Sequence, residues 1–505
     1  MPNVAEAAWT HARTDPDRIA LRGSGDPWTY GDLQRRSAAF AGAVAAAGIA
    51  PGDRVLLSAP SVPEFAAAYF ALHAAGAAVV TVNTMATKPE IEYVIADAEC
   101  KLVVVWHEVG SAPADAAAAQ DVPCWTLEPD AAVSSGEPLT DLHDAALEDT
   151  ATILYTSGTT GRPKGAQLTT GNVLACARIF SEVLEVTPDD RFGTGLPLFH
   201  VFGQAVVMGT TIRAGASLSL LSPFTPGAML EMLRRDELTL MAGVPTMWNA
   251  MLHAAGDYGP DDFTSLRLAA SGGASLPAEV MRAFTDRFGC LILEGYGLTE
   301  TTGAATFNGI HRERKTGAVG IALPECQVEI RGDDGKPVPT GEVGEVYVTG
   351  PVIMKGYYNR PEATAEALVD GWLRSGDLGT MDEDGDVRIV DRLKDLIIRG
   401  GYNVYPREVE EVLYEHPDIV EVAVIGVPDD HLGEEIAAVI APREGAEIDP
   451  VALKAWTKER LSAYKVPRLV QLVDALPKGP TGKVLKRAID ADEVRASAMT
   501  TVAAS

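Results

Sequence analysis

Residues 156–165 read Thr-Ser-Gly-Thr-Thr-Gly-Arg-Pro-Lys-Gly, and they directly follow a predicted strand at 151–155. In such a loop, glycines let backbone N–H groups turn toward an anion, hydroxyl groups add donors and a lysine adds charge. Lys164 has the spacing of a Walker-loop lysine, but Pro163 and Gly165 stand where that motif has its second glycine and its Ser or Thr. The sequence therefore predicts a phosphate-binding loop of another type. Its expected binding residues are Thr156, Ser157, Gly158, Thr159, Thr160, Gly161 and Lys164.

On the N-terminal side of this loop, short runs rich in β-branched residues alternate with longer helical patterns. Strands are predicted at 54–59, 78–83, 101–106 and 151–156, and a helical pattern at 62–75 separates the first two. This alternation is typical of layered α/β folds. Residues 108–150 are rich in Ala, Asp, Pro and Ser, which indicates a surface excursion rather than a domain boundary.

The C-terminal side of the chain has a different pattern. Glycines are dense between Gly332 and Gly385, which favours antiparallel strands there, and beyond residue 391 helices and strands alternate again. The helices are predicted at 406–416 and 450–463, and the strands at 421–427 and 436–441. We therefore expect an α/β protein with a large layered domain, residues 1–392, that ends in a β-rich subdomain, and a small α+β domain, residues 393–505.

The composition is that of a folded globular protein, with 47% hydrophobic and 22% charged residues in 505. The net charge of −28 repels phosphate backbones and argues against nucleic acid as a partner. Five scattered cysteines without a CxxC pair argue against a disulfide framework or a zinc site. The polar N-terminal segment lacks the apolar core of a signal peptide, so we expect a cytoplasmic protein.

Two stretches, 65–82 and 192–212, lack Asp, Glu, Lys and Arg. The first contains His73 among alanines and glycines, and the second contains Pro197, His200 and Gln204. Neither composition suits a lipid-facing helix, so we interpret both as buried core and expect no integral membrane segment.

The chain resembles the adenylate-forming superfamily of acyl-CoA synthetases, adenylation domains and luciferases, and within it the fatty-acid–CoA ligases most. The resemblance extends over nearly the whole chain and is carried by seven motifs in family order. Besides the loop at 156–165, these are Pro-Leu-Phe-His-Val-Phe-Gly at 197–203, Gly-Tyr-Gly-Leu-Thr-Glu at 295–300, Ser-Gly-Asp at 375–377, Asp-Arg-Leu-Lys-Asp at 391–395, Gly-Gly-Tyr-Asn at 400–403 and Pro-Lys-Gly-Pro-Thr-Gly-Lys at 477–483.

The resemblance implies ATP, Mg²⁺ and coenzyme A as cofactors. It places Mg²⁺ on Glu300, beside Thr299, with Thr156 as a weaker candidate; a carboxylate in a turn suits this hard cation. It places the ribose of the nucleotide on Asp377 and Arg392. The adenine is expected along Gly272, Gly273 and Ala274 and against Tyr296, with Glu294 and Gly295 as polar edges.

The resemblance also makes Lys483 the mobile catalytic lysine, whose charge meets the α-phosphate and the substrate carboxylate during adenylation. Lys478 and Lys486 lie close to it in the sequence and compete for that role. His200 is interpreted either as a general base or as an aromatic gate to the acyl channel. We prefer the gate, because a carboxylic acid is already ionised at pH 7 and needs no base for its activation.

Attack by the CoA thiol requires that the lysine be withdrawn, which a mobile C-terminal domain would allow. By resemblance, the hinge is Lys394, and Gly400, Gly401 and Tyr402 line the pantetheine tunnel after rotation. Glycine is suitable there because a thin cofactor arm needs close approach to the backbone.

Around the expected acyl pocket the sequence offers apolar side chains and no obvious buried acid. The residues are Phe199, Phe202, Val206, Val207, Val244, Met247, Trp248 and Thr301. They favour an apolar monocarboxylate over an amino acid. Three small residues at 303–305 favour a deep channel and thus a medium- or long-chain fatty acid.

We therefore expect an AMP-forming acid–thiol ligase that makes a fatty acyl-adenylate and then a CoA thioester, with release of AMP and pyrophosphate. The alternatives are an aryl-acid CoA ligase of the benzoate or cinnamate type and a ligase that loads an acyl carrier protein. From a different class, the alternative is an inactive nucleotide-binding regulatory protein. The oligomeric state stays open, with a homodimer as one candidate.

Overall fold

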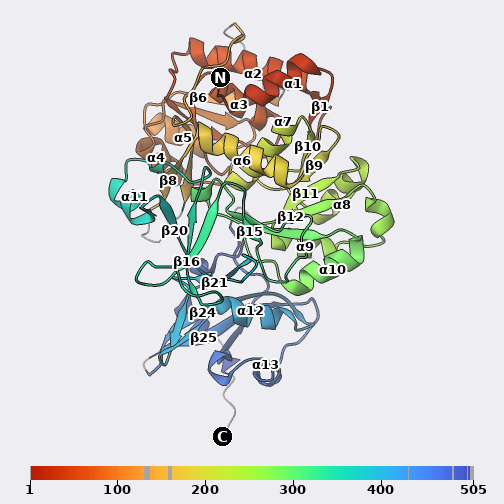
Figure 1. The fold of residues 1–505 in the computed structure, drawn as a ribbon, viewed down its shortest axis with the longest axis vertical. Coiled ribbons are helices and arrows are strands. Elements are labelled where there is room, and N and C mark those ends of the chain that lie inside the picture. The colour runs from red at the N-terminus through yellow and green to blue at the C-terminus, as the bar shows by residue number, and fades with distance from the viewer. Residues whose placement is uncertain are drawn as a thin grey trace.

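The β-branched runs near the N-terminus form a sheet in the order β18-β8-β7-β4-β3-β5-β6 (Figure 1). The computed structural model describes residues 2–129, 137–156, 162–429, 431–479, 483–497 and 499–500. Five strands are parallel; β8 pairs antiparallel with β7, and β18 pairs antiparallel with β8 at the edge of the sheet. The strands are β3 (Arg54–Ser58), β4 (Ala78–Thr81), β5 (Leu102–Trp106), β6 (Cys124–Leu127), β7 (Thr150–Thr156), β8 (Lys164–Thr169) and β18 (Gly356–Tyr357).

A second sheet has the order β15-β14-β13-β12-β11-β9-β10-β1-β2, and its six central strands from β13 to β1 are parallel. Its strands are β1 (Ile19–Arg22), β2 (Trp28–Thr29), β9 (Arg191–Thr194), β10 (Ser217–Leu220), β11 (Leu240–Gly243), β12 (Leu268–Ser271), β13 (Ile292–Tyr296), β14 (Thr306–Phe307) and β15 (Ile321–Ala322). Most residues of the parallel strands are buried, as expected for sheets covered on both faces.

Helices cover both sheets, with α8, α9 and α10 along one side of the strands β11 and β12 in Figure 1. The helices are α1 (Glu6–Thr14), α2 (Tyr30–Ala46), α3 (Pro63–Ala74), α4 (Lys88–Asp97), α5 (Ala112–Ala119), α6 (Thr170–Val183), α7 (Thr210–Ala214), α8 (Pro226–Arg235), α9 (Pro245–His253) and α10 (Ala278–Phe288). Before α7 runs the π-helix η2 (Phe202–Gly209), and short 3-10 turns are η3 (Pro260–Phe263) and η4 (Thr299–Thr301).

The two uncharged stretches are core, as expected. All of α3 apart from the half-buried Glu64 is buried, which matches a helix that is apolar around its whole circumference. The stretch at 192–212 forms most of β9, then η2 and the start of α7, which are also mainly buried. No helix within the described ranges is long and apolar enough to cross a membrane. All five cysteines are free, and the sequence likewise predicted no disulfide framework.

The glycine-rich region forms a third, antiparallel sheet, which confirms the β-rich prediction. Its strands are β16 (Gln327–Arg331), β17 (Gly344–Thr349), β19 (Leu368–Val369), β20 (Trp372–Met381) and β21 (Val387–Arg392), with α11 (Pro361–Ala367) before β19. The chain then enters a fourth sheet with its own hydrophobic core, at the end of the molecule opposite to α1 and α2 in Figure 1.

The fourth sheet and its helices contain the elements predicted after residue 391. The strands are β22 (Ile397–Arg399), β23 (Tyr402–Val404), β24 (Ile419–Asp429), β25 (Gly433–Pro442), β26 (Leu469–Leu472) and β27 (Met499–Thr500). The helices are α12 (Pro406–Tyr414), α13 (Pro450–Lys458) and α14 (Ala491–Ser497), with 3-10 turns η5 (Ala463–Lys465) and η6 (Lys486–Ala488). The α/β fold class with a C-terminal α+β unit is therefore confirmed.

The stretch at 108–150 differs from the prediction. Instead of a purely surface excursion, it contributes α5 and the edge strand β6, which pairs in parallel with β5. The short run Cys-Trp-Thr-Leu at 124–127 is enough to extend the sheet by one strand, because its four residues pair one to one with residues 103–106 of β5.

A buried ion pair in the fourth sheet provides a test of stability. Arg399 Nε lies 2.5 Å from Glu435 Oε1, and the two side chains are only 6% and 7% exposed. We expect Glu435→Ala to lower the free energy of unfolding of this part by about 3–5 kcal/mol, because it leaves a buried guanidinium uncompensated. Urea denaturation measures the loss.

The matched control is Glu279→Ala, which removes an exposed pair with Arg282 whose side chains are 58% and 55% exposed. That change should cost less than about 1 kcal/mol. A loss for Glu435→Ala no larger than for the control would contradict the prediction.

Candidate active site

The carboxyl ends of the parallel strands in the first two sheets meet at one place. Thr156, the last residue of β7, donates a hydrogen bond of 3.3 Å from Oγ1 to Oε1 of Glu300, which lies in the turn η4 after β13. Loops at the carboxyl ends of parallel strands are the usual position of a ligand site in α/β folds. Residues predicted from two distant motifs are therefore neighbours.

Glu300 and Thr156 form an oxygen-rich pair that fits the chemistry of Mg²⁺, which prefers one or two protein oxygens beside phosphate and water. The turn is held by the Met354 N–H, which donates to the Glu300 carbonyl at 2.9 Å. The Glu300 carboxylate has a second donor that the sequence did not indicate. The Tyr357 hydroxyl, on β18, donates a hydrogen bond of 2.8 Å to the same Oε1 atom as Thr156. Thr299 belongs to the same short turn.

The predicted phosphate loop is described only at its flanks, because residues 157–161 lie outside the described residues. Its ends are cross-strand partners, Thr156 on β7 and Lys164 on β8. Tyr93 of α4 donates a hydrogen bond of 2.7 Å to the Pro163 carbonyl. Lys164 Nζ lies 5.2 Å from the centroid of the Tyr357 ring, at cation–π distance. The flanks therefore bring Lys164 next to the residues around Glu300.

The expected ribose residues lie together on the third sheet. Asp377 on β20 and Arg392 on β21 are cross-strand partners, and Arg392 Nε is 3.5 Å from Asp377 Oδ1. Tyr296, at the end of β13, donates a hydrogen bond of 2.6 Å to Asp377 Oδ2. Burial raises the pKa of Asp377, and the charge of Arg392 opposes that rise. The geometry thus combines an acceptor, a cation and an aromatic ring.

Gly272, Gly273 and Ala274 follow β12, and Gly273 has a φ of +82°. A Cβ at Gly273 would lie 2.8 Å from Cε and 3.2 Å from Nζ of Lys483, which comes from the C-terminal domain. Glycine is thus required both by the backbone conformation and by the approach of the lysine. Removal from water, with a contribution from Arg392, lowers the pKa of Lys483 to about 8.

The structure separates Lys483 from its two competitors. Lys478 Nζ is 2.5 Å from Glu421 and Lys486 Nζ is 2.6 Å from Glu410, so both are paired within the C-terminal domain. Lys483 makes no ion pair with any residue that the structure describes. It is therefore the one of the three whose charge is available for an incoming anion.

His200 accepts a hydrogen bond of 3.3 Å at Nδ1 from the Phe202 N–H. In the neutral ring this bond places the proton on Nε2, which makes that nitrogen a donor. Burial, together with the positive charge of Lys483, lowers the pKa of His200 to about 3. Both features disfavour a general base and favour the gate.

The pocket residues divide into two groups. In the first group, each side chain lies close to the backbone of a glycine. A Cβ atom placed on the glycine would be 3.2 Å from the Phe202 ring at Gly272, 3.0 Å from Val206 at Gly303 and 3.6 Å from Val244 at Gly273. Met247 is also near this wall, where its Cε would be 3.1 Å from a Cβ at Gly195.

The other predicted pocket residues, Val207, Trp248 and Thr301, are 0% exposed. The Trp248 ring packs edge-on against Phe284 at 5.3 Å, and the Thr301 hydroxyl accepts a hydrogen bond from the Leu298 N–H at 2.8 Å. In this structure Val207 and Trp248 are packed in the core and Thr301 is held in the η4 turn, and their place in the acyl pocket stays a prediction.

Glu294 is also buried, at 3% exposure, and its carboxylate accepts a hydrogen bond of 3.1 Å from the Leu276 N–H. Burial raises its pKa to about 7. Gly295 pairs with Phe307 of β14. The side chain of Glu294 is thus engaged with the protein backbone.

The predicted tunnel residues lie apart from this site. Gly400 and Gly401 have φ values of +59° and +83°, and Gly401 faces open space. Tyr402 is 61% exposed and lies 4.9 Å from the Tyr464 ring. Lys394, the expected hinge, is exposed between β21 and β22. In this structure Lys483 lies against Gly273, while Gly401 and Tyr402 are open to solvent; the tunnel role of the glycine segment stays a prediction.

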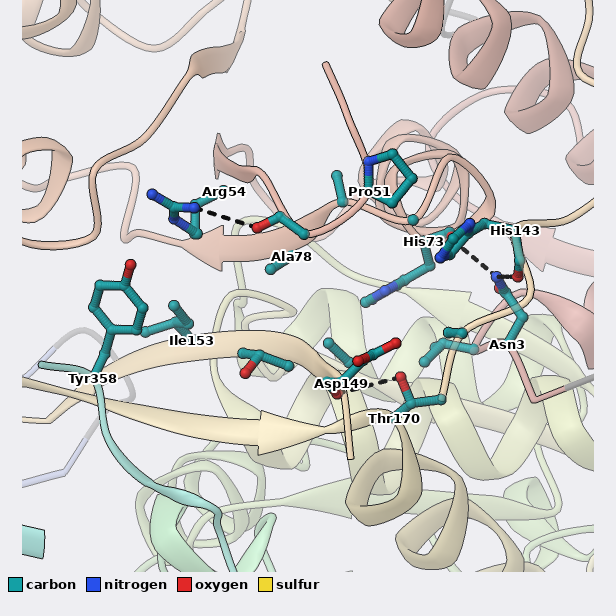
Figure 2. Close-up of a pocket in the computed structure, with 17 residues that line it drawn as sticks. Asn3, Pro51, Arg54, His73, Ala78, His143, Asp149, Ile153, Thr170 and Tyr358 are labelled. Atoms are coloured by element: carbon teal, nitrogen blue, oxygen red, sulfur yellow. Dashed lines mark hydrogen bonds between the residues drawn. The ribbon is translucent and has the colours of Figure 1, made fainter. Parts of the chain in front are cut away.

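A cavity of about 280 Å³ lies elsewhere, at the amino ends of β3, β4 and β7 (Figure 2). Asn3 closes one end by donating hydrogen bonds to the carbonyls of His73 and His143, each at 2.9 Å. Burial lowers the pKa of His73 to about 3, so this ring is neutral. None of the predicted site residues lines the cavity, which is at the opposite edge of the sheet from Thr156.

The chain thus has two parts: a large part whose parallel strands end near Thr156 and Glu300, and a C-terminal part that brings Lys483 against Gly273. Residues 8–358 match the family described as AMP-binding enzyme, and residues 408–483 match the AMP-binding enzyme C-terminal domain. The chain belongs to the AMP-binding enzyme family.

Similar proteins extend over almost its full length. A feruloyl-CoA synthase from an Amycolatopsis species is 41% identical over 490 residues, with 96% of this chain and 98% of the relative covered. A long-chain-fatty-acid–CoA ligase from Bacillus subtilis (strain 168) is 34% identical, with coverages of 95% and 92%. The structure of ATP-bound MatB from Rhodopseudomonas palustris has a TM-score of 0.90 and 35% identity, with coverages of 96% and 98%.

These comparisons confirm the resemblance seen in the sequence. The chain is an ATP-dependent, AMP-forming acyl-CoA ligase that acts through an acyl-adenylate. The identity of its acid and the roles of individual residues are developed below as proposals.

The docked lysine generates a test of the two half-reactions. We expect Lys483→Ala to slow adenylation by about 100-fold or more, because it removes a preorganised charge from the site. Thioester formation from a supplied acyl-adenylate should stay nearly unchanged. Single-turnover assays of each half-reaction measure both rates.

The matched control is Lys478→Ala, whose ammonium pairs with Glu421 inside the C-terminal domain. It should leave adenylation close to the wild-type rate. Equal losses in both half-reactions for Lys483→Ala would reject a role confined to adenylation.

Proposed function

We propose that this enzyme converts an aryl acid of the cinnamate type to its CoA thioester. The observation that carries this proposal is the 41% identity to a feruloyl-CoA synthase with 98% of that relative covered. The wall made by Phe202, Val206 and Val244 supports it, since an apolar wall packed against backbone glycines can accept a flat ring. Among the described residues that form this wall, none is acidic and able to pair with a substrate ammonium group.

In the first half-reaction the acid carboxylate attacks the α-phosphorus of ATP, and pyrophosphate leaves. Lys483 supplies positive charge where the two anions meet, and Lys164 supplies it at the phosphate loop. Asp377 and Arg392 hold the ribose beside Tyr296. Glu300, assisted by Thr156, would hold Mg²⁺, which when bound neutralises phosphate charge.

In the second half-reaction the CoA thiol attacks the acyl carbonyl, and AMP leaves. We propose that the domain boundary lies after Arg392 and that residues 393–505 rotate about Lys394 to withdraw Lys483. The open space at Gly401 and the exposure of Tyr402, while Lys483 lies against Gly273, support this alternation.

A fatty acid is the second candidate substrate. It is supported by the 34% identity to the long-chain-fatty-acid–CoA ligase from Bacillus subtilis and by the same apolar wall. The two acids make the same demand on pocket polarity and differ in shape.

A substrate panel tests the proposal. Carboxylate-dependent pyrophosphate release is measured with hydroxycinnamates, benzoates, C4 to C18 fatty acids and amino acids, each with and without CoA. We expect the highest kcat/KM with a hydroxycinnamate and CoA-dependent formation of its thioester. A fatty-acid optimum would replace the aryl acid, and release that never leads to a CoA thioester would favour a carrier-protein acceptor. No release with any acid would favour the inactive nucleotide-binding protein.

A tunnel variant tests the rotation. We expect Gly401→Leu to slow thioester formation by at least about tenfold while adenylation changes little, because a side chain would fill the path of the pantetheine arm. Gly371→Leu is a matched control, since Gly371 also has positive φ and open space around it. Wild-type CoA kinetics in Gly401→Leu, or equal effects of both variants, would reject this placement.

A further inference from the structure

Two hydroxyl groups converge on the same oxygen of Glu300. Tyr357 donates to Oε1 at 2.8 Å, and Thr156 donates to Oε1 at 3.3 Å. Among the residues that the structure describes, none donates a hydrogen bond to Oε2 and none forms an ion pair with this carboxylate. The carboxylate is thus held by one oxygen while the other stays available to a cation.

Tyr357 also contacts the lysine of the phosphate loop, whose Nζ lies 5.2 Å from the ring centroid. This contact is set by the backbone, because β18 pairs with β8 in the register Tyr357 with Ala166, two residues beyond Lys164. The Tyr358 N–H adds a hydrogen bond of 2.8 Å to the Gly165 carbonyl. One side chain therefore touches both charged groups through different parts: the hydroxyl meets Glu300 and the ring face meets Lys164.

Lys164 and Glu300 have opposite charges and share this neighbour, yet in the described part of the chain they do not form an ion pair with each other. A direct pair would neutralise both groups and remove them from the cation and the phosphates. Each group instead contacts the uncharged Tyr357, the carboxylate through the hydroxyl and the ammonium through the ring, so neither charge is neutralised.

We propose that Tyr357 is a positioning residue that orients Glu300 toward the metal ion, orients Lys164 toward the phosphates and keeps the two from pairing. The proposal rests on the roles given to Glu300 and Lys164 under the proposed function. It adds a residue from the short strand β18, about 190 positions beyond the loop that it supports.

Two variants separate the two contacts. Tyr357→Phe keeps the ring and removes only the hydroxyl, and Tyr357→Leu removes both. Calorimetry of ATP binding with Mg²⁺ and with EDTA is the primary readout. We expect Tyr357→Phe to weaken binding of Mg·ATP by about tenfold, because a hydrogen bond to a charged group is lost, and to leave binding of ATP in EDTA nearly unchanged. Tyr357→Leu should weaken both.

Kinetics provide the second readout. In Tyr357→Phe the KM for Mg·ATP should rise by a similar factor, while thioester formation from a supplied acyl-adenylate keeps its rate because that step uses neither group. Tyr358→Phe is the matched control, since this neighbour lies over Arg54, at 5.8 Å, and away from Glu300. It should behave as wild type in every assay.

Equal losses with Mg²⁺ and with EDTA, equal losses in both half-reactions, or equal effects of Tyr357→Phe and Tyr358→Phe would each overturn the proposal. Glu300→Gln distinguishes this failure from failure of the proposed function. If Glu300→Gln leaves Mg·ATP binding intact, the role of Glu300 itself is wrong. If Glu300→Gln weakens binding and Tyr357→Phe does not, only the positioning role of Tyr357 is wrong.

Discussion

The arrangement depends on bringing a lysine from one domain into a site built by another. Lys483 passes over Gly273 without an ion-pair partner in the described structure, and its pKa falls to about 8. Because that pKa is below the ordinary value of 10.5, burial in the docked position disfavours the charged form of the lysine, and an anion placed beside it would offset this cost. Under the proposed function, departure of pyrophosphate would remove part of that offset before the second step.

The same logic explains how a protein with a net charge of −28 can hold a polyanion. The cations are local: Lys164 on β8, Arg392 on β21 and Lys483 from the C-terminal domain reach one site from three sheets or domains. The nearby lysines Lys478 and Lys486 do not contribute, because Glu421 and Glu410 already pair with them. Under the proposed function, local pairing rather than the overall charge would decide which cations meet the nucleotide.

Much of this could be predicted from the sequence where the signal is contiguous. The strand rhythm predicts β3, β4, β5 and β7, and the family resemblance, which made both residues candidate ligands of Mg²⁺, implies that Thr156 and Glu300 lie near each other. Tyr357 could not be found that way, because its contacts depend on the pairing of β18 with β8, which no local pattern encodes. Trp248 shows a second limit of the sequence. Its apolar character predicts burial, but it does not indicate whether the ring lines a pocket or packs against another core residue, as it does against Phe284.

That limit also explains why the substrate cannot be deduced from the pocket residues alone. A hydrophobic wall contributes binding energy in proportion to buried apolar area, so an aryl ring and an alkyl chain of similar area gain similar stabilisation from Phe202, Val206 and Val244. Discrimination has to come from shape, and shape is set by side-chain volumes along the whole wall. Chains that share much of their sequence tend to share the shape of a site, so identity over nearly the full length of a relative adds information that the polarity of a few residues does not contain.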